Sequence, residues 1–152
     1  MESKNVHIHI SSEQELEQDD TMVVQNIPGI RTDDGKGKIY LRYEEKMEGV
    51  DEKVRTLITI QGGTLHIKRS GGVKTTMDFL IGKKTTCEYF MPMGVMHFEI
   101  KTEELKIIDT VDTLEITLKY SMAMEGEVVS VNSLSLKTEV DESFSDVKIN
   151  LV

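Results

Sequence analysis

Short runs in which apolar and polar residues alternate occupy most of the 152-residue chain. In the clearest run, residues 54–60, the apolar or β-branched side chains of Val54, Thr56, Ile58 and Ile60 recur at every second position. A period of two with β-branched residues is typical of β-strands. The following Gly62-Gly63 pair supplies the positive φ of a tight hairpin turn, so the pattern predicts an antiparallel hairpin here.

The same alternation recurs along the chain and predicts about ten or eleven strands, with no long helix and no fixed repeat. Consecutive hairpins of this number are typical of a sandwich or a barrel. A meander of neighbouring hairpins closes most simply into an up-and-down barrel, which leaves no exposed strand edges. We therefore expect an all-β fold, a single antiparallel barrel of about 8–11 strands. The predicted strands are 6–10, 22–27, 39–43, 54–60, 65–69, 73–79, 86–91, 96–101, 105–108, 114–124 and 128–137, with a possible last strand at 147–151.

The segments between these strands are predicted as loops. Residues 11–20 are polar and acidic, and a capping-box pattern at Ser12 to Glu15 predicts at most one helical turn there. Pro28-Gly29 is expected to end the second strand, and residues 32–37 form a turn cluster. The domain prediction is one barrel over residues 1–152, with a core at about 5–138 and an acidic tail at 139–152.

Composition narrows the class of protein. Hydrophobic residues make up 38% of the chain, enough for one core, and no apolar run reaches the length of about 20 residues that a membrane helix requires. The first residues lack the layout of a signal peptide, and the single cysteine, Cys87, forms no internal disulfide. We expect a soluble cytoplasmic protein that does not bind membranes.

Charge argues against one class of partner. The net charge of −9 would repel a phosphate backbone, so nucleic acid is not an expected partner. The charge is uneven, however, because the central hairpins are basic. The basic side chains of these hairpins have two open interpretations, a rim that binds a small anion and an ordinary solvated surface. The basic residues are Arg55, Lys68, Arg69, Lys74, Lys83 and Lys84.

Methionine is the most unusual feature of the expected interior. The chain has nine methionines and no tryptophan, and Met77, Met96, Met122 and Met124 fall on apolar faces. Flexible thioethers suit a pocket that adapts to apolar ligands, although large inner side chains also fill small barrels completely. The candidate ligand-binding residues are Arg69, Met77, Phe79, Tyr89, Met96, Phe98, Tyr120 and Met122.

Arg69 supplies the candidate polar contact. It lies just before the turn Ser70-Gly71-Gly72, so we expect it at a barrel mouth, where a guanidinium can hold a carboxylate by paired hydrogen bonds. A carboxylate-bearing lipid would then have its tail among the methionines. A surface arginine and a structural salt bridge are the alternatives.

Other reactive residues lack the partners that chemistry requires. His7 and His9 share a strand face, and His66 and His97 are expected on outward faces, but none has a zinc-ligand spacing around it. Cys87 is expected to be buried and inert. The sequence contains no G-x-S-x-G, H-E-x-x-H or C-x-x-C motif. We therefore predict no catalytic residues, no metal and no cofactor, and an enzyme is the third and weakest hypothesis.

Several of these residues together resemble a known family. The stretch Lys38 to Glu44 and the strand ending at Tyr120 to Met122 are similar to the YwiB-like family of uncharacterised bacterial proteins, as is a longer central block. The resemblance covers roughly residues 5–138. It implies a calycin-like (lipocalin-like) β-barrel and implies no activity. The central block comprises Arg69-Ser70-Gly71, Val73-Lys74, Phe79, Gly82, Thr86, Tyr89, Gly94, Glu99 and Lys101-Thr102.

Two hypotheses follow. In the first, the barrel binds a small, partly apolar and anionic ligand inside. In the second, the interior is filled and the protein acts through protein–protein contact, as a homodimer for example. An interior cavity of roughly 300 Å³ or more beside Arg69 would favour binding, whereas a filled interior and an exposed apolar patch would favour a partner.

Overall fold

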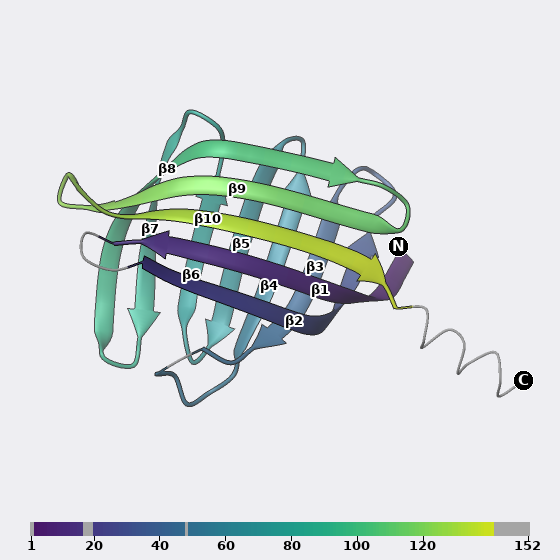
Figure 1. Cartoon of the computed structure of the whole chain (residues 1–152), viewed down its shortest axis with the longest axis horizontal. Helices are drawn as coiled ribbons and strands as arrows, with labels where there is room; N and C mark the ends of the chain where they lie inside the picture. Colours follow the sequence, from purple (N-terminus) through teal and green to yellow (C-terminus); the bar gives the residue numbers. More distant parts are fainter. Residues whose placement is uncertain (1, 17–19, 48, 142–152) are drawn as a thin grey trace, which may run out of the picture.

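Ten antiparallel strands form the barrel in the computed structural model, which describes residues 2–16, 20–47 and 49–141 (Figure 1). The described residues contain no helix, and so no helix long and apolar enough to cross a membrane. The strands are β1 Glu2–Glu15, β2 Asp20–Asp33, β3 Ile39–Glu45, β4 Val54–Gln61, β5 Thr64–Gly71, β6 Lys74–Phe79, β7 Lys84–Met91, β8 Gly94–Asp109, β9 Thr113–Met124 and β10 Glu127–Val140.

The strands close in sequence order. Each strand pairs with the next along the chain, and β10 returns to pair with β1. In Figure 1, β9, β10, β1 and β2 cross the front of the view, while β4, β5 and β6 run behind them at a steep angle. The predicted all-β fold, a closed up-and-down antiparallel barrel, is confirmed. Its narrower description as calycin-like stays a prediction.

Alternation places one apolar side chain in every two inside the barrel. On β3, for example, Ile39, Leu41 and Tyr43 are buried while Arg42 and Glu44 are exposed. One cluster of twenty buried residues, rich in isoleucine and leucine, forms the core. Burial of these side chains, at about 1.5–3 kcal/mol for each large one, is the main term that stabilises the closed sheet.

Two predicted interruptions do not interrupt the sheet. Residues 11–15 continue β1, and β1 pairs with β2 from Glu2↔Asp33 to Glu15↔Asp20, so the predicted loop with a helical turn was wrong there. Pro28-Gly29 does not end β2. A side chain at position 29 would place its Cβ 2.4 Å from Ile8 Cδ1, so glycine lets the inner side chains of β1 pack against the β2 backbone.

The strands predicted at 96–101 and 105–108 form one long strand, β8, which a β-bulge between Thr102 and Glu104 bends. At the ends of the chain the barrel extends slightly beyond the predicted core, from Glu2 to Val140. The strand predicted at 147–151 lies outside the described residues. The predicted cytoplasmic location stays a prediction.

The barrel is closed unevenly. β2 pairs with β3 only at residues 29–33, so residues 20–28 pair with β1 alone among the described strands. Three consecutive apolar side chains, Met22, Val23 and Val24, are exposed on this part of β2. The β1–β2 hairpin therefore extends past β3 and leaves a lateral gap beside the start of the β3–β4 loop.

Candidate functional site

Arg69 lies inside the barrel. It occupies the inner face of β5, opposite Thr56 of β4 and Thr75 of β6, two residues before the glycine turn that the sequence indicated. Only 19% of its side chain is exposed. The guanidinium is therefore turned into the barrel rather than toward solvent, and the predicted position at a barrel mouth stays a prediction.

One carboxylate partners this guanidinium. Arg69 Nε donates a hydrogen bond to Glu45 Oε1 at 3.3 Å, and the same oxygen accepts a bond of 3.1 Å from Thr56 Oγ1. Glu45, 8% exposed, is the last inner residue of β3, although it lies in the segment between 43 and 54 that the sequence predicts as a loop. Its position continues the alternation of Ile39, Leu41 and Tyr43, which is the signal that could have found it. The structural salt bridge left open by the sequence is present.

The other four N–H donors of Arg69 have no hydrogen-bond partner among the residues that the structure describes. A guanidinium has five N–H donors, and among the described residues only the Nε donor of Arg69 has a partner. Two cavities are lined by this side chain, so its Nη groups have space beside them. Burial opposes the charge, whereas the carboxylate of Glu45 favours it, and the pKa of Arg69 is raised. The result is a fixed, incompletely neutralised cation in the interior.

An apolar cavity of about 390 Å³ lies on one side of Arg69. Five methionines line it, together with aromatic rings from three strands. Seven of the eight candidate residues meet here. The eighth, Phe79, is fully buried in the core, where its ring packs on Tyr120 with the centroids 4.8 Å apart. The seven are Arg69, Met77, Tyr89, Met96, Phe98, Tyr120 and Met122.

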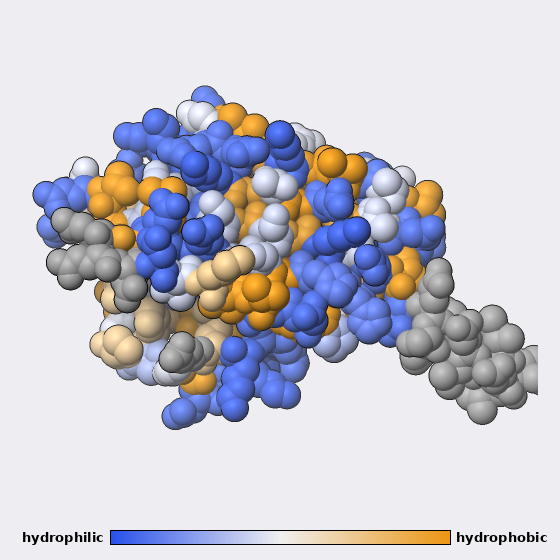
Figure 2. All heavy atoms as spheres, in the orientation of Figure 1, coloured by the Kyte–Doolittle hydropathy of each residue, from blue (hydrophilic) through white to orange (hydrophobic). Residues whose placement is uncertain are grey.

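The cavity reaches the surface at the end of the barrel that holds the β7–β8 and β9–β10 turns. Met96 and Met124, predicted on inner faces, line the cavity but are each 37% exposed at its rim. Exposed apolar residues, including Leu16 and Val129, continue this rim. In Figure 2, orange and tan side chains are visible among blue ones at the left-hand end of the molecule, the end that holds the β9–β10 turn in Figure 1.

A second, more polar cavity of about 420 Å³ lies on the other side of Arg69. It shares five lining residues with the apolar cavity, Gln14, Arg69, Met77, Tyr120 and Asn132. Its outer wall includes Thr21 and Gln25 of β2 and Lys46 of the β3–β4 loop, so it opens through the lateral gap. Burial raises the pKa of Tyr43 and of Tyr120, which keeps both phenols neutral as hydrogen-bonding groups.

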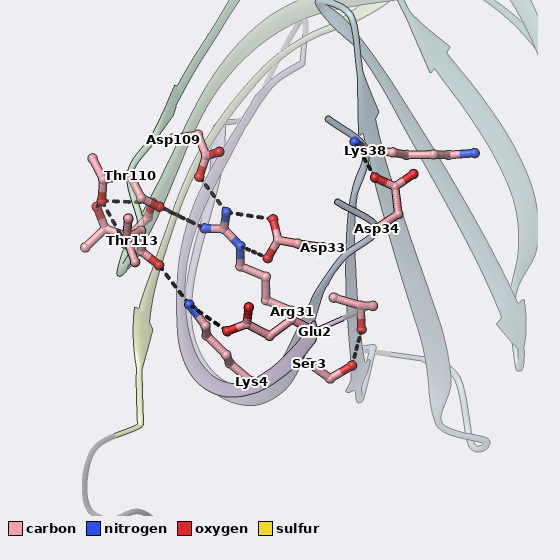
Figure 3. A network of polar contacts seen from close by, with 12 residues as sticks. Glu2, Ser3, Lys4, Arg31, Asp33, Asp34, Lys38, Asp109, Thr110 and Thr113 are labelled. Atoms are coloured by element: carbon pink, nitrogen blue, oxygen red, sulfur yellow. Dashed lines mark hydrogen bonds and ion pairs between the residues drawn. The ribbon is translucent and has the colours of Figure 1, made fainter. Parts of the chain in front are cut away.

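Arg31 provides an internal comparison. It is not among the candidate residues, because the pattern predicts that the second strand ends at residue 27. Arg31 is 4% exposed and its five donors are occupied: Asp33 accepts two bonds at 3.0 and 3.1 Å, and Asp109 accepts one at 2.6 Å. The carbonyls of Thr110 and Thr113 accept the other two at 3.4 Å (Figure 3). Arg31 thus ties β2 to the β8–β9 turn at the opposite end of the barrel, whereas Arg69 keeps four donors available.

The other candidates stay apart from this site. Cys87 is buried, and burial raises the pKa of its thiol. The histidines lie on outward faces next to polar partners, such as Asp78 for His66 and Asp141 for His7. In the described part of the chain no three His, Cys, Asp or Glu side chains are grouped so that they could hold a metal ion.

Comparison with known proteins identifies the family. The model of the domain of unknown function DUF1934 matches residues 8–136. The uncharacterised β-barrel protein YwiB of Bacillus subtilis (strain 168) is 25% identical over 104 residues, which cover 68% of this chain and 72% of that protein. The crystal structure of the YwiB protein from Bacillus subtilis has the same fold, with a TM-score of 0.81 over 91% of this chain and 93% of that chain at 21% identity. The predicted family is confirmed, and this chain belongs to the DUF1934 family of YwiB-like β-barrel proteins.

Proposed function

We propose that the barrel binds a small, partly apolar anion, with the anionic group on Arg69 and the apolar part in the methionine-lined cavity. The observation that carries this proposal is the contrast between the two buried arginines. Arg31 has a partner for every donor, whereas Arg69 has one partner and two adjoining cavities. Buried donors are normally satisfied, so four free ones beside a cavity favour a ligand or ordered water that accepts from them.

The shape of the interior supports an amphipathic ligand. The apolar cavity exceeds the size of roughly 300 Å³ at which small-molecule sites begin. Its methionines adapt to different apolar shapes. The polar cavity beside it, with Asn132 and Gln14 shared between the two, would accommodate the anionic group and its water. A carboxylate is the simplest anion with this geometry, because it can accept two parallel bonds from a guanidinium.

The test has two parts. Native mass spectrometry of protein purified from its own host should show extra mass that is lost on organic extraction. Octanoate and octanol then serve as matched probes that differ only in the head group. Because a hydrogen bond to a charged group contributes about 1.5–3 kcal/mol, octanoate should bind roughly 10- to 100-fold more tightly than octanol.

Variants assign the effect to the site. Arg69→Met should remove the preference for octanoate, and Met122→Arg should block both probes or prevent folding. Arg42→Met, an exposed arginine outside the barrel, is the matched control and should change neither affinity. Equal binding of the two probes by the wild-type protein, or no binding of either together with a clean apo mass, would refute the proposal.

A homodimer is the second candidate function, and one feature favours it. Residues 21–27 of β2 carry no charge, expose Met22, Val23 and Val24, and pair only with β1. Proteins normally protect such an edge with charges or proline, because open strands pair with other chains. The same native spectra report the oligomeric state. A dimer that Val24→Lys dissociates would support edge-to-edge pairing, and a monomer at all concentrations would exclude it.

A further inference from the structure

An outer groove of about 900 Å³ continues from the polar cavity beside Arg69 to the surface. The two hollows share Tyr43, Glu45 and Lys46 in their walls. They meet there because β2 pairs with β3 only as far as Tyr43, so Glu44 and Glu45 have partners on β4 but none on β2. The interior site is therefore open sideways, through the lateral gap, as well as at the end of the barrel.

The groove is positively charged although the protein is acidic. Its walls carry five cationic side chains and two carboxylates, a net charge of +3, whereas the whole chain has a net charge of −9. Both carboxylates already have partners, because Glu44 lies 3.9 Å from Lys53 Nζ and Glu45 accepts a hydrogen bond from Arg69. Charge of one sign gathered in a concave surface attracts an anion and raises its local concentration.

Three of these cations have no compensating partner. Lys46, Arg55 and Lys68 form no ion pair with any residue that the structure describes. Arg42 also borders the groove, but its guanidinium lies over the ring of Tyr40, 5.5 Å from the centroid, and Tyr40 does not line the groove. The groove therefore has three cations available to an anion, and Lys46 is the one that also lines the polar cavity.

Two of the three cations are close enough to repel each other. Arg55 and Lys68 are diagonal neighbours across β4 and β5, since Arg55 pairs with Ser70, and such neighbours lie about 7–8 Å apart. An anion between two like charges at this distance replaces their repulsion by attraction. The single carboxylate that Arg69 holds would leave this repulsion in place.

We propose that the ligand of the barrel is a dianion whose second anionic group lies in the outer groove, against Lys46 with Arg55 and Lys68 beside it. This inference rests on the function proposed above, in which the first anionic group lies on Arg69. Arg69 and Lys46 line the same polar cavity of about 420 Å³, so a head group that fills this cavity contacts both. The ligand class is an acyl chain joined to a head group that carries a carboxylate and a second carboxylate or a phosphate.

Two isosteric probes test the second anionic group. N-octanoylglutamate and N-octanoylglutamine have the same shape and the same α-carboxylate, and they differ by one negative charge. Because exposed ion pairs are individually weak, calorimetric titration at low salt should show about 5- to 20-fold tighter binding of the glutamate conjugate. About 0.5 M NaCl should reduce this preference to about 2-fold or less, because it screens exposed charges. N-octanoylphosphoserine, compared with the glutamate conjugate, distinguishes a phosphate from a carboxylate as the second group.

Variants locate the preference in the groove. Lys46→Met combined with Arg55→Met should reduce it to about 2-fold or less. Lys101→Met combined with Lys119→Met removes the same charge from exposed positions on β8 and β9 and should keep the full preference. Equal binding of the two conjugates by the wild-type protein, or an unchanged preference in the groove variant, would overturn the inference.

The inference and the proposed function fail in different ways. If octanoate binds more tightly than octanol while the two conjugates bind equally, Arg69 holds the only anionic group and the second site does not exist. If octanoate and octanol bind equally, the proposed function fails and this inference fails with it.

Discussion

Replacing Arg31 by methionine should destabilise the barrel more than the same replacement of any other arginine except Arg69, which lines the two interior cavities. The variant removes five hydrogen bonds, three of them to the carboxylates of Asp33 and Asp109. It also disconnects β2 from the β8–β9 turn, so the closed end of the barrel loses its main polar contact.

The magnitude follows from the exposure of the partners. Removal of one member of a fully buried ion pair costs about 3–5 kcal/mol, because the other charge stays buried. The side chains of Asp33 and Asp109 are 33% and 43% exposed, so water can hydrate them in the variant. We therefore expect a loss of about 2–4 kcal/mol in the free energy of unfolding. For a domain of this size the midpoint of thermal unfolding should fall by about 5–12 °C.

Urea denaturation followed by circular dichroism measures this loss directly. Arg31→Lys should recover part of the stability, because it keeps the charge but cannot reach two carboxylates and two carbonyls at once. The exposed Arg42→Met is the control and should stay within about 0.5 kcal/mol of the wild type. If Arg31→Met were as stable as this control, the five contacts would contribute nothing, and the argument that satisfied donors mark a structural arginine would fail.

Three further predictions concern the fold. Gly29→Ala should destabilise the protein by about 1–3 kcal/mol in urea denaturation, because its Cβ would lie 2.4 Å from Ile8 Cδ1; stability equal to the wild type would show that Ile8 moves away freely. Burial raises the pKa of Tyr43 and Tyr120, so their contribution to stability is complete below the unfolded pKa of about 10 and is lost as the pH rises above it. Unfolding and tyrosinate absorbance should then appear together at alkaline pH, and early ionisation of all tyrosines without unfolding would contradict this. The thiol of Cys87 should react with a disulfide reagent much more slowly in native than in denatured protein, because burial both shields it and raises its pKa; equal rates would contradict its burial.

The sequence predicted the fold wherever one face of a strand is buried. Hairpins such as β4–β5 combine strict alternation with glycine turns, and both signals are local. The prediction of a loop failed at residues 11–15, where β1 continues and pairs with β2 past the end of β3. There the side chains of both strands are largely exposed, so burial imposes no alternation, and backbone pairing alone holds the strands. Long-range pairing of this kind leaves little trace in the local pattern.

The candidate site was predictable as far as inner and outer side chains alternate regularly along each strand. Seven of the eight candidate residues line one cavity, because methionines and aromatic residues on the inner faces of adjacent strands must converge. Glu45 and Asn132 were missed, since a polar residue on an inner face resembles a loop residue until its partners are known. Arg31 was missed for a different reason, because Pro28 was taken as the end of a strand that in fact continues to Asp33.

The two buried arginines lie in different surroundings, one with every donor bonded and the other beside two cavities. At one end, every donor of the Arg31 guanidinium is bonded. The core there is rich in isoleucine, whose branched side chain does not adapt to the shape of a ligand as methionine does. At the other end, Arg69, flexible methionines and the lateral gap beside β2 combine an available charge with space. A barrel with a purely structural interior would gain stability from replacing the Arg69–Glu45 pair by apolar residues, since the desolvation of buried ions usually offsets their attraction. If Arg69→Met with Glu45→Met were more stable than the wild type yet lost the preference for octanoate, the pair would be explained by binding rather than by folding.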